Sequence, residues 1–98
     1  MFRVGDLSVD LVRRTVRIGE RDVELSSKEY DLLRVLVQHA GKVLPHKFLL
    51  GKLWSNLTEP QYLRVCVGHL RRKIEVAAGR PQYVLTVPGI GYRLRASD

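Results

Sequence analysis

Apolar and polar residues alternate along the first 25 positions, a pattern typical of strands with one buried face. The pairs Gly5-Asp6, Arg13-Arg14 and Gly19-Glu20 interrupt this alternation and suit turns. The apolar rows between the turns are Leu7, Val9 and Leu11, then Val16 and Ile18, then Val23 and Leu25. The pattern predicts a small antiparallel sheet of three or four short strands.

From residue 26 the apolar positions follow a helical period. Ser26 and Glu29 have the spacing of a capping box, in which each side chain binds the other residue's backbone N–H group. This predicts a helix from about Ser26 to a stop at Gly41. Pro45 suits the first turn of a second, short helix that ends near Trp54.

A third helix is predicted from a cap at Thr58, with Pro60 in its first turn, to about Ala77. Gly79 and Pro81 follow as stop signals. Alternating apolar residues then predict a C-terminal hairpin that turns at Pro88-Gly89. Its apolar positions are Tyr83, Leu85, Val87, Tyr92 and Leu94.

The third helix has two unlike faces when its residues are placed 100° apart. One narrow stripe consists of Leu63, Val67, Leu70 and Ile74, which we expect in the core. The opposite surface is polar, basic or small, and consists of Gln61, Val65, Gly68, His69 and Arg72. Arg side chains pair with phosphates and guanine edges, so this surface suits a DNA groove.

The charge of the 98-residue chain is formally +7, and more than half of this excess lies in residues 61–80. Such a field favours an anionic partner, and nucleic acid is the first candidate. A basic helix that follows a short helix and precedes a hairpin matches a helix-turn-helix with a wing. The fold class predicted is therefore α+β, a winged helix-turn-helix.

Other functions find less support in the residues. No grouping typical of an enzyme is present, and Cys66 with His69 would supply only half a metal site, so no cofactor or metal is expected. No apolar run is long enough for a membrane span. One alternative stays open: a winged-helix interaction module whose basic helix docks an acidic protein partner.

Six segments, in order, resemble the C-terminal effector domain of OmpR/PhoB-type response regulators. Tyr62–Arg64 followed by Val67–Arg71 is similar to the KdpE-like branch. The six segments are Gly5–Leu7, Leu25–Leu33, Gly41–Leu44, Leu49–Trp54, Val67–Ile74 and Gly89–Leu94. The resemblance implies a four-stranded N-terminal sheet, three helices and a hairpin wing. It also implies one DNA-binding effector domain over residues 1–98, with no receiver domain in this chain.

The resemblance implies binding to double-stranded DNA for transcription regulation, as the output domain of a two-component system in the bacterial cytoplasm. The residues expected to read bases are Arg64, Val65, His69 and Arg72. The residues expected to contact phosphates are Tyr62, Arg71, Lys73, Thr86, Arg93 and Arg95. A tandem or symmetric dimer on DNA is implied, and Ser55 to Pro60 is the segment where some members contact RNA polymerase. Pro88 replaces an Arg that several members insert into the minor groove.

Overall fold

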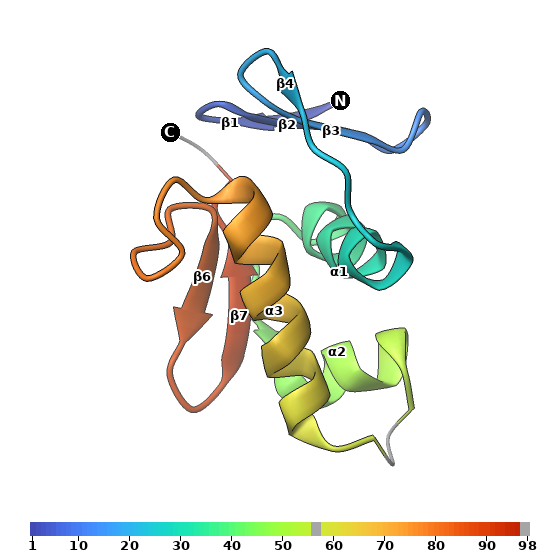
Figure 1. Ribbon diagram of the computed structural model, residues 1–98. Coiled ribbons are helices and arrows are strands. Elements are labelled where there is room, and N and C mark those ends of the chain that lie inside the picture. The colour runs from blue at the N-terminus through green and yellow to red at the C-terminus, as the bar shows by residue number, and fades with distance from the viewer. Residues whose placement is uncertain (56–57, 97–98) are drawn as a thin grey trace.

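The computed structural model describes residues 1–55 and 58–96. An N-terminal sheet, three helices and a C-terminal wing follow one another along the chain (Figure 1). The N-terminal sheet is antiparallel, with its four strands in chain order. Its strands are β1 (Phe2–Val4), β2 (Leu7–Asp10), β3 (Thr15–Ile18) and β4 (Arg21–Asp22). The predicted sheet is confirmed, although Val23 and Leu25 lie beyond its last strand.

Helix α1 (Ser27–Gln38) begins at the predicted capping box. The backbone N–H of Glu29 donates to Ser26 Oγ over 3.2 Å, and the backbone N–H of Ser26 donates to Glu29 Oε1 over 2.9 Å. The helix ends before Gly41, which has φ +84° and donates its N–H to the carbonyl of Leu94. The capping prediction is confirmed.

The second helix, α2 (His46–Leu53), follows a two-residue strand, β5 (Leu44–Pro45), that the sequence pattern did not predict. Pro45 is the N-cap residue of α2, so it precedes the first turn. Strand β5 pairs with the last strand of the wing, opposite Tyr92 and Gly91. A Cβ atom at Gly91 would lie 1.9 Å from the carbonyl oxygen of Leu44, so this close pairing requires glycine.

Helix α3 (Pro60–Ile74) is shorter at both ends than the sequence predicted. Its N-cap is Glu59, which makes no side-chain capping bond, so the predicted Thr58 cap is wrong. The helix stops at Ile74 because the next residue, Glu75, has extended backbone. The buried Glu75 carboxylate accepts backbone N–H bonds from residues 82, 83 and 84, which fixes the connection to the wing.

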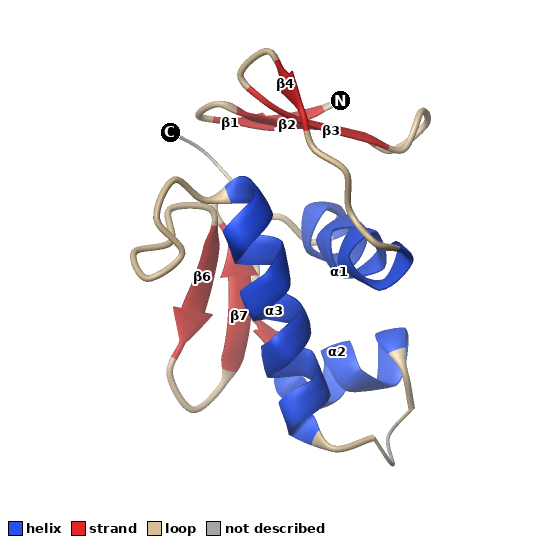
Figure 2. Ribbon diagram, in the orientation of Figure 1, coloured by secondary structure: helices blue, strands red, loops and turns tan. Residues whose placement is uncertain are grey.

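The wing is an antiparallel hairpin of β6 (Val84–Val87) and β7 (Gly91–Leu94) (Figure 2). Strand β5 pairs with the edge of β7 that does not face β6. Its turn contains Gly89 at φ +75°, as predicted. Tyr92 is buried and joins the hairpin to the core.

The apolar stripe of α3 forms the centre of the core, and each of its four residues is at most 1% exposed. The stripe residues are Leu63, Val67, Leu70 and Ile74. In Figure 1, α3 lies between the wing and α1, and it also contacts α2. The predicted orientation of α3 is therefore confirmed. Among the described residues, no helix combines the length and apolar character needed to cross a bilayer.

Candidate nucleic-acid interface

The side of α3 that faces away from the core presents the residues predicted to read bases. Arg64, His69 and Arg72 are exposed, and Val65 is 54% exposed. Tyr62, a predicted phosphate contact, is also exposed near the N-terminal end of the helix. The fold thus brings five of the predicted DNA-contacting residues together on one helix surface.

Gly68 lies within this surface. A Cβ atom there would meet no other described atom within 4 Å. Glycine lowers helix stability by about 1 kcal/mol relative to alanine, and no contact in the described part of the domain requires it. Its small size instead leaves room on the exposed side of α3 for a partner that approaches the helix backbone closely.

The flank of α3 next to the wing is held by Arg71. Its Nε and Nη2 atoms donate to the carbonyl oxygen of Val84 over 3.0 and 2.7 Å, and Nη2 donates to Thr86 Oγ1 over 2.8 Å. Its guanidinium carbon lies 5.7 Å from the ring centre of Tyr92. Arg71 and Thr86, both predicted to contact phosphates, thus bind each other and fix the wing against α3. Their phosphate contacts stay a prediction.

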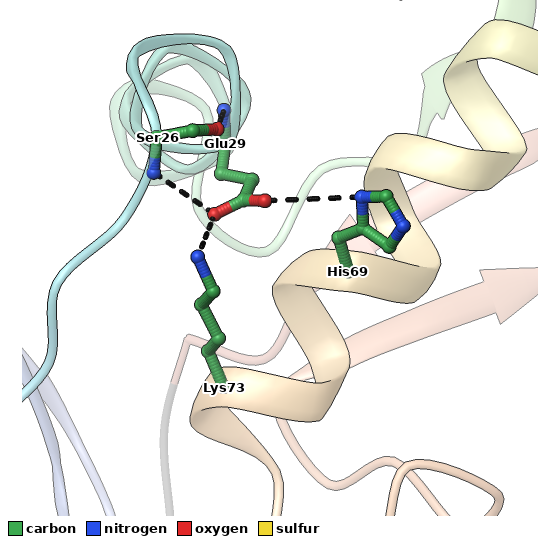
Figure 3. Close-up of polar contacts among 4 residues, drawn as sticks. All are labelled: Ser26, Glu29, His69 and Lys73. Atoms are coloured by element: carbon green, nitrogen blue, oxygen red, sulfur yellow. Dashed lines mark hydrogen bonds and ion pairs between the residues drawn. The ribbon is translucent and has the colours of Figure 1, made fainter.

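The flank next to α1 is held by a carboxylate (Figure 3). Lys73 Nζ lies 2.6 Å from Glu29 Oε1, and His69 Nδ1 lies 3.9 Å from Glu29 Oε2. Burial by itself raises the pKa of Glu29, but hydrogen bonds from Lys73 and from the backbone of Ser26 lower the pKa overall. Lys73, another predicted phosphate contact, is therefore paired within the domain.

Sequence reasoning found Glu29 only as a capping residue. Its partner Lys73 is 44 positions away in the chain, and local spacing carries no signal for such a contact. The opposite charges of Glu29 and Lys73 were the only available hint that the two side chains pair.

The two remaining predicted phosphate contacts lie on or just after β7. Arg93 is half-buried and pairs in register with Leu85 of β6. The guanidinium of Arg95 lies 5.4 Å from the ring centre of Tyr83, and its backbone N–H donates to the Tyr83 carbonyl. Arg95 therefore lies at the base of the wing, away from the tip, where Ile90 is 52% exposed.

Two other predictions concern the segment from Ser55 to Pro60 and the cysteine. Residues 56 and 57 of that segment lie outside the described residues. Cys66 is buried, and burial raises the pKa of its thiol to about 11. Among the described residues, no group of three or more His, Cys, Asp and Glu is placed to hold a metal ion.

Residues 19–94 match the family described as "Transcriptional regulatory protein, C terminal". The chain belongs to this family. The predicted resemblance to OmpR/PhoB-type effector domains is thereby confirmed, and this family consists of transcription regulators, not enzymes.

Several members of the family are similar over nearly the whole chain. The KDP operon transcriptional regulatory protein KdpE of Escherichia coli is 43% identical over 95 residues, which are 95% of this chain and 42% of that protein. The transcriptional regulatory protein PrrA of Mycobacterium tuberculosis is 40% identical over 94 residues, or 94% of this chain and 40% of that protein. The chain thus spans about two fifths of the length of these relatives.

Two solved structures of family members confirm the winged-helix fold. The Klebsiella pneumoniae RstA DNA-binding domain, in complex with the RstA box, has a TM-score of 0.86 and 30% identity over 97% of this chain and 96% of that one. The Thermotoga maritima response regulator DrrB, an OmpR/PhoB homolog, has a TM-score of 0.90 and 31% identity over 96% of this chain and 43% of that one.

Proposed function

We propose that this domain binds double-stranded DNA sequence-specifically and is the output domain of a two-component response regulator. The observation that carries the proposal is the exposed surface of α3, where Arg64, His69 and Arg72 are exposed while the apolar stripe of the same helix is buried. A basic helix held on its apolar side and preceded by a short helix is suited to enter the major groove. The RstA domain, which covers nearly the same length and was solved on DNA, supports this reading.

We assign base reading to Arg64, Val65, His69 and Arg72. Arg and His can bond base edges, and the exposed Val65 can contact a thymine methyl group. The missing side chain at Gly68 supports close approach of the duplex to the helix.

We assign phosphate contacts to Tyr62 and Arg93, with Arg95 at the base of the wing. Arg71 donates to a carbonyl and a hydroxyl oxygen, which do not neutralise its charge, so it adds to the field that attracts phosphates. The main role that we assign to Arg71 is to hold the wing in a fixed position against α3.

The finer partner assignments follow from the family resemblance. A tandem or symmetric dimer on DNA would place two copies of α3 in successive major grooves. We also propose that the segment from Ser55 to Pro60 contacts RNA polymerase and that the protein is located in the bacterial cytoplasm.

The sharpest test is selection of bound duplexes from a random pool at physiological salt, which yields a motif and a half-site spacing if the proposal holds. With the selected duplex, Arg72→Ala and His69→Ala should each weaken binding by roughly 1–3 kcal/mol. The matched control is Arg13→Ala, which also removes an exposed side chain but lies between β2 and β3.

Three outcomes would each contradict a part of the proposal. Recovery of no enriched motif would remove sequence-specific binding. If an acidic protein were captured while random duplex DNA failed to bind even at low salt, the interaction-module alternative would replace it. Equal losses in all three variants would mean that α3 presents a different face to DNA.

A further inference from the structure

The carboxylate of Glu29, on α1, lies beside the surface of α3 that we propose binds DNA. Glu29 has only 9% of its side chain exposed, whereas Lys73 and His69 are 40% and 50% exposed. Figure 3 shows both α3 side chains directed toward the Glu29 carboxylate. Both side chains are therefore accessible to DNA, but Lys73 already has a counter-ion in Glu29 of α1.

Helix capping does not explain why this residue carries a charge. In a capping box, Gln at the third helical position can accept the N-cap N–H bond as Glu does. The negative charge of Glu29 also suits the N-terminal end of the α1 dipole, but its ion-pair partner Lys73 and the nearby His69 lie on another helix.

We propose that Glu29 competes with DNA phosphates for Lys73 and thereby suppresses non-specific binding, as a specificity-determining residue of the domain. The inference rests on the proposed DNA-binding function. DNA of any sequence is attracted through its phosphates, and each neutralised phosphate adds about 0.9 to the slope of log K against log salt. A lysine paired at 2.6 Å with a buried carboxylate contributes little to that attraction.

The cost of releasing Lys73 explains why random DNA does not displace Glu29. If Lys73 moved to a phosphate, the largely buried Glu29 carboxylate would lose its strongest partner. Removing one partner of a buried charge is costly, because the remaining charge is neither solvated nor paired. A cognate site binds mainly through base contacts of Arg72 and its neighbours and depends less on Lys73. Glu29 therefore lowers affinity for random DNA more than affinity for the cognate site.

The test replaces Glu29 by Gln, which keeps the capping bond and removes the charge. Binding to a random duplex is measured by fluorescence anisotropy across a KCl series. Glu29→Gln should steepen the slope by about 0.9, the value for one phosphate neutralised by Lys73. Affinity for the random duplex should rise several-fold, and the ratio of cognate to random affinity should fall. Adding Lys73→Met to Glu29→Gln should remove the Lys73 share of the increase.

The control is Glu20→Gln, which makes the same charge change in the turn between β3 and β4, near the edge of the N-terminal sheet in Figure 1. It should leave the slope unchanged. A second comparison needs no change at Glu29: Lys73→Met should leave the slope unchanged, whereas Arg93→Met, at an assigned phosphate contact, should reduce it by about 0.9. This comparison remains decisive if Glu29→Gln does not fold.

The outcomes separate the two proposals. Equal slopes for the unchanged chain and a folded Glu29→Gln variant, with random DNA bound by both, would overturn the role of Glu29 and leave the DNA-binding function intact. A reduced slope for Lys73→Met alone would do the same. Failure of the unchanged chain to bind any duplex at low salt would overturn the proposed function, and the inference with it.

Discussion

The two flanks of α3 are both tied to the rest of the domain by cationic side chains, but they use different acceptors. On the wing side, Arg71 donates to the carbonyl of Val84 and to the hydroxyl of Thr86. On the α1 side, Lys73 donates to the carboxylate of Glu29. A neutral acceptor fixes the position of a cation and leaves its charge, whereas a carboxylate fixes the position and neutralises the charge. The wing flank therefore remains electropositive, and the α1 flank does not.

This difference shows why counting basic residues overstates the charge available to a partner. Residues 61–80 contain five Lys and Arg against Glu75 alone, which makes this segment the most basic part of the sequence. The structure brings a second carboxylate to that helix from α1. The electrostatic footprint is consequently shifted toward Arg71 and Arg72, on the wing side and the outer surface of α3.

The largest change in the free energy of unfolding is expected in the buried stripe of α3, because both flanks of the helix depend on its packing. Leu70→Ala should reduce the free energy of unfolding by roughly 2–5 kcal/mol, because Leu70 is fully buried and the truncation leaves a cavity. Val65→Ala, on the exposed side of the same helix, should change it by less than about 0.5 kcal/mol. Urea unfolding of both variants measures the contrast. Similar losses in the two would mean that the stripe does not support the flanks.

The next largest change in stability is expected at the wing flank, where Arg71 binds β6. Arg71→Met should lower the free energy of unfolding by roughly 1.5–3 kcal/mol, the range for hydrogen bonds to a charged group. Arg72→Met is the matched control, because Arg72 is exposed on the same helix and should stay within about 0.5 kcal/mol. Thermal or urea unfolding provides the measurement. Equal stability of the two variants would show that the bonds to Val84 and Thr86 do not hold the wing.

The smallest change in stability is expected at the α1 flank, and it depends on pH because it comes from the Glu29 carboxylate. The pKa of Glu29 is lowered in the folded protein, so its ionised form contributes stability above its ordinary value of 4.5. That contribution is lost as the pH falls through the lowered pKa. The stability difference between the unchanged chain and Glu29→Gln should therefore be largest near neutral pH and shrink as the pH drops below about 4.5. A difference that stays constant from neutral to about pH 3 would contradict this linkage.

Features set by neighbouring residues were predicted well. The capping box of Ser26 and Glu29, the buried stripe of α3 and the Gly89 turn each depend on side chains a few positions apart. Periodicity and turn chemistry report such local requirements directly. The resemblance of six short segments then identified the family, which a profile match over residues 19–94 confirms.

The errors occurred where a distant or unexpected partner decided the outcome. Strand β5 exists because β7 pairs with it, and Leu44–Pro45 alone carries no strand pattern. Helix α3 ends early because the Glu75 carboxylate binds backbone N–H groups seven to nine residues ahead. At its other end, Glu59 and not Thr58 is the N-cap, which shows that a favourable capping residue is not always used.

The amino-acid order alone determined which side of the third helix is apolar and which side is exposed, because that assignment needs only the helical repeat. Only the folded chain decided which cations lie beside a counter-charge. Lys73 and Arg71 stand two positions apart, yet one meets a carboxylate of α1 and the other a carbonyl of the wing. Ion pairing depends on distance in space, and the fold brings residues 44 positions apart within 2.6 Å.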